Sequence, residues 1–559
     1  MENSLKPFLR LLIIVAILFL IGLLFWLYWC RCCPRDKNDR GGYVPGSEVF
    51  QDLSTARIEP QRVKGAPYPA FEIKCEEPNQ NPPRLVPNGP LRGNFMPANN
   101  AIKMLEIKKK KEDVPAEAGS ADPVVFDTYT PFNNNFPGGI PPDMSGAQNG
   151  NVVLMSGNTW ASLSTDGGNV FTPLNPTTIF PSGATSDASG NALAGALCCD
   201  QVIHYVPQID RFIWYMQFRR TGGGANGDVN KIRIASASTA DIISSGGTAW
   251  TYWDIFSSTI GQTNWMDYPD VSYGNNSLYL STDVVNVGLV VMRLPLSSIQ
   301  SSSSISFQYT QSTDGAVPYG GHISQNTGNE VFWAGHNSNS QIRIYSLKEG
   351  EGRYYWRDVN INSWNNGTIS SIAPGGIDWI VNFFPRNAVI GATRRNNEIW
   401  FAWTASAGGG FQNPHVQVAK FKISDYSLID QMQIWNNDYA FCYPSLNTNS
   451  DNEVGISLGW GGRNFYGNNA VGIMGDFVVW YPQLSDTVGS INTSSGLAIR
   501  FGDYFSVRRA NPQTRMFAAS GYAVRKNSTS SVRWVFSNYY ILFGRNSVVN
   551  GTGKTSEIK

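Results

Sequence analysis

A repeated unit of about sixty residues, which begins near residue 142, restricts the fold more than any other feature of the sequence. Each unit has a polar or acidic residue, a short apolar strand, a turn of Asn, Gly or Asp, and then a strongly apolar strand. The leading residues of the seven units lie 52 to 70 residues apart and are Asp143, Asp200, Asp270, His322, Asn387, Ser445 and Asp503. This spacing is typical of four-stranded propeller blades joined by loops of variable length.

The third and fourth strands of two units can also be located in the sequence. In the second unit the third strand begins at Lys231 and the fourth spans residues 250–255; in the fifth unit they span 416–421 and 428–435. No run of helical period and length follows residue 122, so the domain is predicted to be all-β. Because a ring of stacked sheets buries both faces of each blade, we predict a seven-bladed β-propeller, with six blades as the alternative.

The ring also needs a closing strand, and the sequence offers a candidate ahead of the first unit. Residues 124–129 form an apolar stretch that could complete the last blade near residues 540–543. We therefore expect a strand from the N-terminal side of the repeats to close the propeller.

Residues 164–171 read Ser-Thr-Asp-Gly-Gly-Asn-Val-Phe and predict a tight turn between two strands. Gly167 and Gly168 can adopt the positive φ values that such turns require. The side chains of Ser164 and Asp166 can accept hydrogen bonds from N–H groups of the turn, and Phe171 is expected to fold back over the hairpin.

This octet resembles the Asp-box of the sialidase-like β-propellers, whose pattern is Ser-x-Asp-x-Gly-x-Thr-Trp. Ser164, Asp166 and Gly168 match the pattern, whereas Val170 and Phe171 replace Thr and Trp. The resemblance covers eight residues and implies a fold rather than a catalytic group; an ordinary Asp-Gly-Gly hairpin is the alternative. Sialidases of this superfamily need three arginines, a Tyr–Glu pair and an acidic Asp. Their Phe-Arg-Ile-Pro-like stretch is absent, and the nearest string, residues 384–387, has a different order.

The N-terminal region carries a predicted transmembrane helix at residues 11–30. This run of twenty apolar or aromatic residues lies between Arg10 and Arg31 and ends in an aromatic belt, which a cleavable signal peptide would lack. We therefore expect a single-pass signal-anchor in the lipid bilayer, preceded by a short tail at residues 1–10. Residues 31–122 are rich in Pro, Asn and charge and are predicted as a juxtamembrane segment and stalk, followed by the propeller at 123–548 and a tail at 549–559.

Two features bear on the orientation of this anchor. The cysteines next to the membrane segment, Cys30, Cys32 and Cys33, are candidate S-acylation sites, which would favour a cytosolic position for the residues that follow. Candidate N-glycosylation sequons point the other way and lie at Asn275, Asn366, Asn492, Asn527 and Asn550. Together with the resemblance to secreted propellers, they lead us to expect an extracellular or luminal propeller.

The composition excludes several functional classes. Charged residues make up 15% of the chain and the net charge is +1, so we expect no nucleic-acid partner. The seven cysteines have neither the spacing of a disulfide framework nor that of a zinc site.

The repeat itself nominates the candidate site. Equivalent residues at the start of the innermost strands of a propeller converge at one mouth of the central channel. They could hold a calcium ion or a polar ligand there, or each could cap its own blade turn through local hydrogen bonds. The residues concerned are Asp143, Asp200, Asp270, His322 and Asp503.

We find no nucleophile elbow, phosphate loop or zinc-protease motif in the sequence, and so we nominate no catalytic residue. We expect a membrane-anchored propeller for recognition, adhesion or surface display, which binds a glycan or protein ligand and could form a homo-oligomer. The alternative is a membrane-anchored glycan-cleaving enzyme, either a sialidase-like hydrolase or a lyase.

Overall fold

The computed structural model describes residues 49–64, 102–104, 106–108, 122–131, 141–158, 160–180, 197–218, 229–285, 287–310, 321–380, 388–476, 478–480, 485, 501–526 and 534–551. The chain divides into two units, Met1–Tyr43 and Val44–Lys559, and all described residues belong to the second. In that described part, no helix is both long and apolar enough to cross a bilayer. The predicted membrane segment at 11–30 lies outside it.

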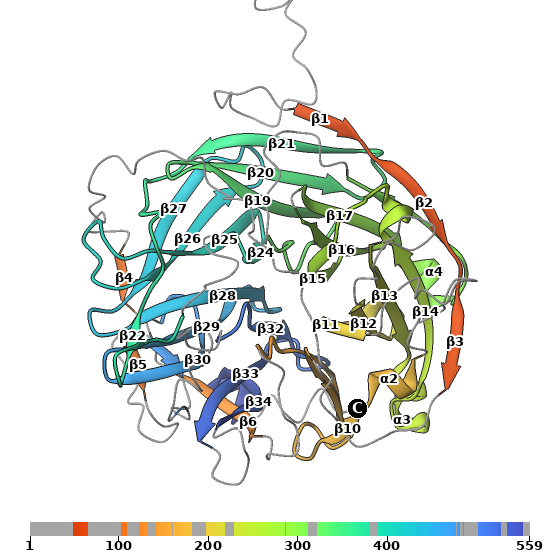
Figure 1. The fold of residues 1–559 in the computed structure, drawn as a ribbon, viewed down its shortest axis with the longest axis horizontal. Helices are drawn as coiled ribbons and strands as arrows, with labels where there is room; N and C mark the ends of the chain where they lie inside the picture. Colours follow the sequence, from red (N-terminus) through yellow and green to blue (C-terminus); the bar gives the residue numbers. More distant parts are fainter. Residues whose placement is uncertain are drawn as a thin grey trace, which may run out of the picture. The chain divides into compact units, whose positions relative to one another are not determined.

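Seven β-sheets surround a central axis, as Figure 1 shows, and each of the seven predicted units contributes one sheet. From the axis outwards, blade 1 contains β7 (Ser145–Asn149), β8 (Val152–Gly157), β9 (Trp160–Ser164) and β10 (Thr172–Leu174). Blade 2 contains β11 (Leu197–Val206), β12 (Arg211–Phe218), β13 (Lys231–Ala237) and β14 (Ala249–Phe256). Blade 3 contains β15 (Met266–Tyr273), β16 (Ser277–Val284), β17 (Gly288–Pro295) and β18 (Ile305–Tyr309).

The other four blades follow the same order. Blade 4 contains β19 (Glu330–Ser338), β20 (Gln341–Lys348) and β21 (Arg353–Asn360), and blade 5 contains β24 (Gly391–Arg395), β25 (Glu398–Ala405), β26 (His415–Lys422) and β27 (Leu428–Trp435). Blade 6 contains β28 (Ala440–Thr448), β29 (Val454–Gly462), β30 (Phe465–Ile473) and β31 (Val478–Trp480). Blade 7 contains β32 (Ser506–Arg509), β33 (Phe517–Lys526) and β34 (Trp534–Arg545). The prediction of an all-β, seven-bladed propeller is therefore confirmed, and the six-bladed alternative is wrong.

Short elements fill the connections between strands. The described helices are α2 (Pro176–Ile179), α3 (Thr239–Ser245), α4 (Leu296–Gln300) and α5 (Asn546–Val549), with 3-10 turns η1 (Pro207–Ile209) and η2 (Ser257–Ile260). A small hairpin, β22 (Ile372–Ala373) with β23 (Ile377–Asp378), lies between blades 4 and 5 in the sequence.

The ring closes as the sequence predicts. Strand β6 (Val124–Pro131) pairs antiparallel with β34 and forms the outer edge of blade 7, with Thr130 opposite Tyr540 and Phe126 opposite Phe543. The first and last parts of the repeat region are thus joined by backbone hydrogen bonds within one sheet.

The N-terminal segment forms an unexpected belt, which we define as residues 49–64. Its strands β1 (Val49–Asp52), β2 (Ser54–Ile58) and β3 (Gln61–Lys64) pair antiparallel with the outer strands of blades 4, 3 and 2 in turn. Figure 1 shows them along the rim. Further on, β4 (Ile102–Met104) and β5 (Glu106–Lys108) pair in parallel with blades 5 and 6. The predicted stalk at 31–122 thus contains strands of the propeller, because the outer strands have unpaired backbone groups that a passing segment can satisfy.

The core lies between the blades rather than at the axis alone. Strands of the inner three positions are buried on both faces, and side chains of adjacent sheets share the same apolar clusters. Trp253 and Met292, for example, belong to one cluster between blades 2 and 3. This arrangement fixes each inner strand against its neighbours and so sets the geometry of the central channel.

The turn at residues 164–171 joins β9 to β10 and has the predicted hydrogen bonds. Ser164 Oγ accepts from the Gly168 N–H at 2.9 Å, and Asp166 Oδ1 accepts from the N–H groups of Asn169 and Val170 at 3.1 and 3.0 Å. Gly167 and Gly168 have φ values of 80° and 90°. Ser164 Oγ also donates to Asp166, and this bond is the main cause that lowers the pKa of the Asp166 carboxyl.

The same turn contacts blade 7, and this contact cannot be read from the sequence alone. Thr130 of β6 donates its hydroxyl to the Gly168 carbonyl at 2.5 Å, and Phe171 packs edge-on against Tyr540 with ring centroids 6.0 Å apart. The Tyr540 hydroxyl in turn donates to Gln148 of β7 at 2.6 Å. Phe171 therefore packs onto the seventh blade.

Candidate functional site: the central channel

The innermost strands carry the predicted site residues to the axis of the propeller. Asp200 lies in β11 and Asp270 in β15, whereas Asp143 lies two residues before the start of β7 and Asp503 three residues before the start of β32. His322 lies in residues 321–328, the irregular inner segment of blade 4. All five side chains are buried, and four are less than 5% exposed.

The structure places these residues in two neighbouring groups. His322 contacts both groups, because its ring centroid lies 5.0 Å from that of Tyr268 and 5.8 Å from that of Tyr504. The first consists of Asp143, Asp200 and Asp503, which surround the phenols of Tyr268 and Tyr504. Burial raises the pKa of both tyrosines well above the usual range, and the nearby carboxylates raise it further. The rings of these tyrosines meet edge to face, with centroids 5.5 Å apart.

Asp143 makes structural hydrogen bonds within the first group. Its Oδ1 accepts from the backbone N–H of Asp503 at 2.7 Å, and its Oδ2 accepts from Asn158 Nδ2 at 2.9 Å. The first bond joins blade 7 to blade 1, and the second ties the start of β7 to the end of β8. For Asp143 the geometry therefore favours the capping interpretation over a free ligand-binding carboxylate.

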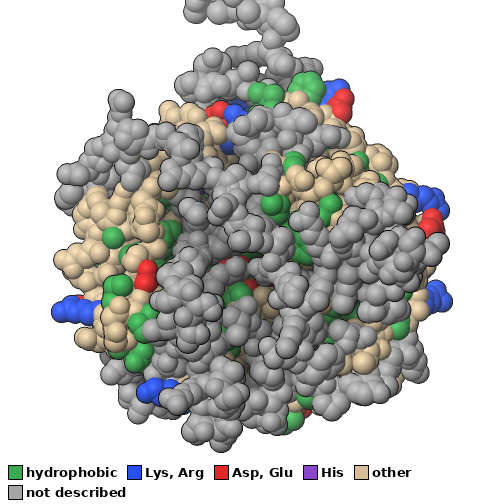
Figure 2. Space-filling model, in the orientation of Figure 1, with side chains coloured by type: hydrophobic (Ala, Val, Ile, Leu, Met, Phe, Trp, Pro, Cys, Tyr) green, Lys and Arg blue, Asp and Glu red, His purple; other side chains and the backbone are tan. Residues whose placement is uncertain are grey.

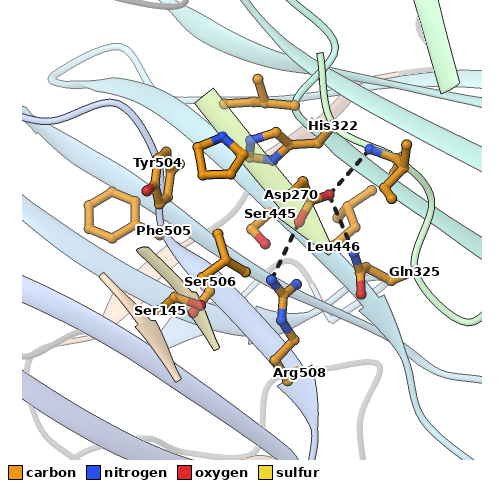
Figure 3. A pocket seen from close by; sticks show the side chains of 15 residues that line it. Ser145, Asp270, His322, Gln325, Ser445, Leu446, Tyr504, Phe505, Ser506 and Arg508 are labelled. Carbon is orange, nitrogen blue, oxygen red and sulfur yellow. Dashed lines mark hydrogen bonds and ion pairs between the residues drawn. The ribbon is translucent and has the colours of Figure 1, made fainter. Parts of the chain in front are cut away.

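The second group contains Asp270 and His322, which lie beside a residue that the sequence did not nominate. Asp270 Oδ1 is 3.5 Å from Arg508 Nη2, and both side chains are less than 8% exposed. Asp270 Oδ2 accepts from the Ile323 N–H at 3.2 Å (Figure 3). Burial lowers the pKa of Arg508, while the carboxylate of Asp270 acts against that shift.

Gln325 extends this network across the channel. Its Nε2 donates to the Val271 carbonyl at 3.0 Å and lies 3.5 Å from Asp270 Oδ2, and its Oε1 lies 3.0 Å from His204 Nε2. Burial lowers the pKa of His204 to about 3, so this ring is neutral at physiological pH. We call Asp270, Arg508, Gln325 and His204 the axial network.

Inner strands of adjacent blades are also bonded directly to each other. The Ile203 N–H donates to Ser145 Oγ at 3.0 Å, and Ser272 Oγ donates to the Ser324 carbonyl at 2.7 Å. In blade 4 the backbone of Gln325 exchanges hydrogen bonds with blade 5, accepting from Arg394 N and donating to Ala392 O, both at 2.9 Å. These bonds hold the inner strands close together and narrow the channel.

The space left at the axis is correspondingly small. One cavity lies among Asp270, His322 and Tyr504 and has a volume of about 10 Å³; a second lies beside His204 and Arg509 and has a volume of about 20 Å³. Such volumes hold roughly one or two water molecules. These two cavities are too small for a sugar ring or a peptide.

The arrangement also offers little for metal or acid–base chemistry. Within the ranges that the structure describes, no three His, Cys, Asp or Glu side chains are grouped so that they could hold a metal ion. The calcium expectation thus gains no support from the described carboxylates. Asp270 is engaged by Arg508, and burial lowers the pKa of His322.

Arg508, Gln325 and His204 complete the site and were missed by sequence reasoning. His204 is a polar residue within the otherwise apolar run Val-Ile-His-Tyr-Val, whereas Gln325 lies in the mostly polar run His-Ile-Ser-Gln-Asn-Thr. The position of His204 is a detectable signal of a buried polar network. The partners could not be assigned, because Arg508 and Asp270 belong to blades that are far apart in the sequence.

The candidate modification sites fall partly outside the described residues. Asn275 and Asn550 are exposed and Asn366 is partly exposed, so these three sequons lie on the surface. Asn492, Asn527 and Cys30, Cys32 and Cys33 lie outside the described ranges.

The face in Figure 2 shows how the charged side chains are distributed around the channel. Most of the coloured Lys, Arg, Asp and Glu side chains lie singly or in pairs near the rim, and a few acidic ones lie nearer the middle. On this face the coloured residues therefore form no continuous basic surface.

Comparisons with known proteins find similar solved structures but no matching family. No protein-family model matches the sequence, and no curated protein matches it either. Similar solved structures include the NanB sialidase from Streptococcus pneumoniae, with 11% identity, coverage of 74% of this chain and 71% of that one, and a TM-score of 0.32. AofleA from Arthrobotrys oligospora has 10% identity, coverage of 64% and 90%, and a TM-score of 0.34. The SapL1 lectin in complex with alpha methyl fucoside has 10% identity, coverage of 62% and 98%, and a TM-score of 0.32. At these values the similarity carries no conclusion about ligand or activity.

Proposed function

We propose that this chain is a membrane-anchored recognition propeller, which binds a glycan or protein ligand on its outer surface. One observation carries the proposal: the axial network and the bonds between inner strands leave cavities of only about 10 and 20 Å³ in the described channel. A propeller enzyme with an axial active site needs space there for its substrate and reactive groups, whereas a binding protein can use its rim and loops.

The anchor and the orientation belong to the same proposal. The apolar run at residues 11–30 supports a single-pass anchor, and the exposed sequons at Asn275 and Asn550 suit an extracellular or luminal propeller. Protease treatment of sealed vesicles tests this orientation. Digestion of the propeller from the cytosolic side would contradict it.

The full chain, purified in detergent, should be tested on a glycan array and on a panel of fluorogenic glycosides. We expect binding to a restricted set of glycans without release of the fluorophore. Turnover of any glycoside would instead favour the glycan-cleaving enzyme. Lack of binding on the array, together with capture of a defined protein ligand, would shift the proposal from glycans to proteins.

A further inference from the structure

A polar groove lies at the rim between blades 2 and 3 and has a volume of about 370 Å³. This volume is within the range of roughly 300–1,000 Å³ that is typical of small-molecule sites. We call it the rim groove. Its polar lining residues are Arg62, Arg211, Ser236, Asp241, Thr251 and Ser302, and its apolar lining residues are Val63, Ala237, Ala249 and Trp250.

The register of blade 2 explains why this groove is polar. Arg62 of the belt lies opposite Thr251 of β14, which lies opposite Ser236 of β13, so three polar residues form one row across three strands. The next row on the same face contains Trp253 and Ile234, which pack in the apolar cluster against blade 3. A polar row therefore interrupts an otherwise apolar face and opens at the edge where the belt strand β3 is added.

Ser236 places a buried hydroxyl beside the groove. Its side chain is 4% exposed, and its hydroxyl has no hydrogen-bond partner among the described residues. A buried hydroxyl without a partner costs free energy, so native proteins normally pair such groups with protein, water or ligand. The hydroxyl itself is inaccessible to solvent, so the hydroxyl-bearing residues that a ligand in the groove can reach are Thr251 and Ser302, which are partly exposed.

The charges of the groove favour an anion. Arg62 and Arg211 supply two guanidinium groups and Asp241 one carboxylate, so these lining residues carry a formal charge of +1. Arg211 is held by backbone carbonyls, including that of Gln300 at 2.8 Å and that of Asp210 at 2.9 Å. Asp241 accepts a hydrogen bond from Ser238 at 2.7 Å and lies at the start of α3.

We propose that the rim groove binds a hydroxylated monosaccharide with one carboxylate, such as a hexuronic acid. A guanidinium binds a carboxylate with two parallel hydrogen bonds, and the hydroxyls of Thr251 and Ser302 can exchange hydrogen bonds with the hydroxyls of a sugar. This inference rests on the proposed recognition function. It adds a place and a ligand class, and it makes the belt part of the binding site through Arg62.

The test is titration calorimetry of the full chain in detergent with glucuronate, glucose and inorganic phosphate. We expect glucuronate to bind, glucose to bind at least roughly tenfold more weakly, and phosphate to bind more weakly than glucuronate, because only glucuronate offers both the charge and the hydroxyls. Absence of glucuronate binding, equal binding of glucose, or tighter binding of phosphate would each overturn the proposal.

Three variants locate the binding on the protein. Arg62→Ala should weaken glucuronate binding by roughly tenfold, because it removes a charge-assisted hydrogen bond. Arg57→Ala is the matched control, since Arg57 is an exposed belt arginine that pairs with Glu59 outside the groove. Asp241→Asn should strengthen glucuronate binding, because it removes a carboxylate that repels the carboxylate of the ligand. This variant leaves the belt unchanged, so its effect cannot come from a loss of belt docking.

The outcomes separate this proposal from the proposed function. If Arg62→Ala and Arg57→Ala bind glucuronate equally and Asp241→Asn has no effect, the groove assignment is wrong. Recognition would still stand if the same proteins bind glycans on the array. Turnover of glycosides, by contrast, would overturn the proposed function whatever the variants do.

Discussion

Gly168 is the point at which the turn between β9 and β10 comes closest to blade 7. A Cβ atom added here would lie 2.6 Å from Cε1 of Tyr540, whereas at Gly167 the nearest atom would be 3.8 Å away. Both residues have positive φ, so a side chain at either position adds backbone strain. Substitutions at the two glycines can therefore be compared directly, because contact with Tyr540 is the main difference between the two positions.

We expect Gly168→Ala to destabilise the chain more than Gly167→Ala. Backbone strain should cost each variant about 1 kcal/mol, and overpacking against Tyr540 should add about 1–3 kcal/mol to Gly168→Ala alone. Urea denaturation of both variants measures the difference. Equal losses would mean that the turn does not pack on blade 7.

Arg508 compensates a carboxylate that is almost completely buried. Replacing Arg508 with Leu leaves Asp270 without its ionic partner, which should lower the free energy of unfolding by roughly 3–5 kcal/mol. The double variant Arg508→Leu/Asp270→Asn should recover part of the loss. The control is Arg353→Leu, because the pair of Arg353 with Asp52 is exposed to solvent and should contribute little to stability. A similar loss in Arg508→Leu and Arg353→Leu would contradict a buried axial network.

At the scale of the elements, the belt covers the outer edges of three blades. Its pairing partners are the outer strands β21, β18 and β14, and Ile58 of β2 is 5% exposed within the cluster between blades 2 and 3. Unpaired outer strands would offer free N–H and C=O groups to other molecules. The belt therefore protects the rim as well as tying blades together.

We expect a chain of residues 123–559 to aggregate and to melt at a lower temperature than a chain of residues 44–559. Both lack the predicted membrane segment, so the comparison isolates residues 44–122. Size-exclusion chromatography with light scattering and a thermal melt provide the two measurements. Equal melting temperatures and two monodisperse samples would show that the belt adds no stability.

Strong local patterns made the blades predictable from sequence. The inner strands are apolar runs bounded by turn residues, and even the closing strand β6 was recognisable from its apolar residues 124–129. The belt has no such pattern: β1 reads Val-Phe-Gln-Asp and is mostly exposed. Its position depends on backbone pairing with β21, some three hundred residues later, and neither periodicity nor composition reports such pairing.

The candidate site was predictable only in part, for a related reason. Equivalent positions in a repeat are expected to converge, and the described leading residues lie in or near the inner strands of their blades. The contacts among these residues depend on the order of the blades around the ring and on the conformations of individual side chains. Asp143 bonds to the backbone of Asp503, whereas Asp270 faces Arg508, and the sequence treats these two aspartates alike.

At the scale of the whole molecule, every histidine of the chain is buried. Burial lowers the pKa of His204, His336 and His415 to about 3 and also lowers that of His322. In the unfolded chain the same groups titrate near 6.5. Between these values the unfolded state binds more protons, so stability is fully present above about pH 6.5 and is lost as the pH falls towards 3.

We expect each of the three strongly shifted histidines to cost roughly 2 kcal/mol of stability between pH 7 and pH 5. His336→Phe should remove about a third of this pH dependence, because the His336 ring packs between Trp364 and Trp403, with centroids 4.7 Å from each, and a phenyl ring suits that site. Urea titrations at both pH values, with and without the substitution, measure the effect. Stability that is independent of pH over this range would contradict the burial of these rings.

The pairing of the belt with later strands also means that the belt is synthesised well before its partners. Asp52 is 301 residues ahead of its partner Arg353, so β1 leaves the ribosome long before the strand that it joins. At about 5–20 residues per second, the belt waits roughly 15–60 s for blade 4. Blade 7, which pairs with β6, is completed last. Every nascent chain therefore passes through a period in which its N-terminal strands are made but have no partner strand.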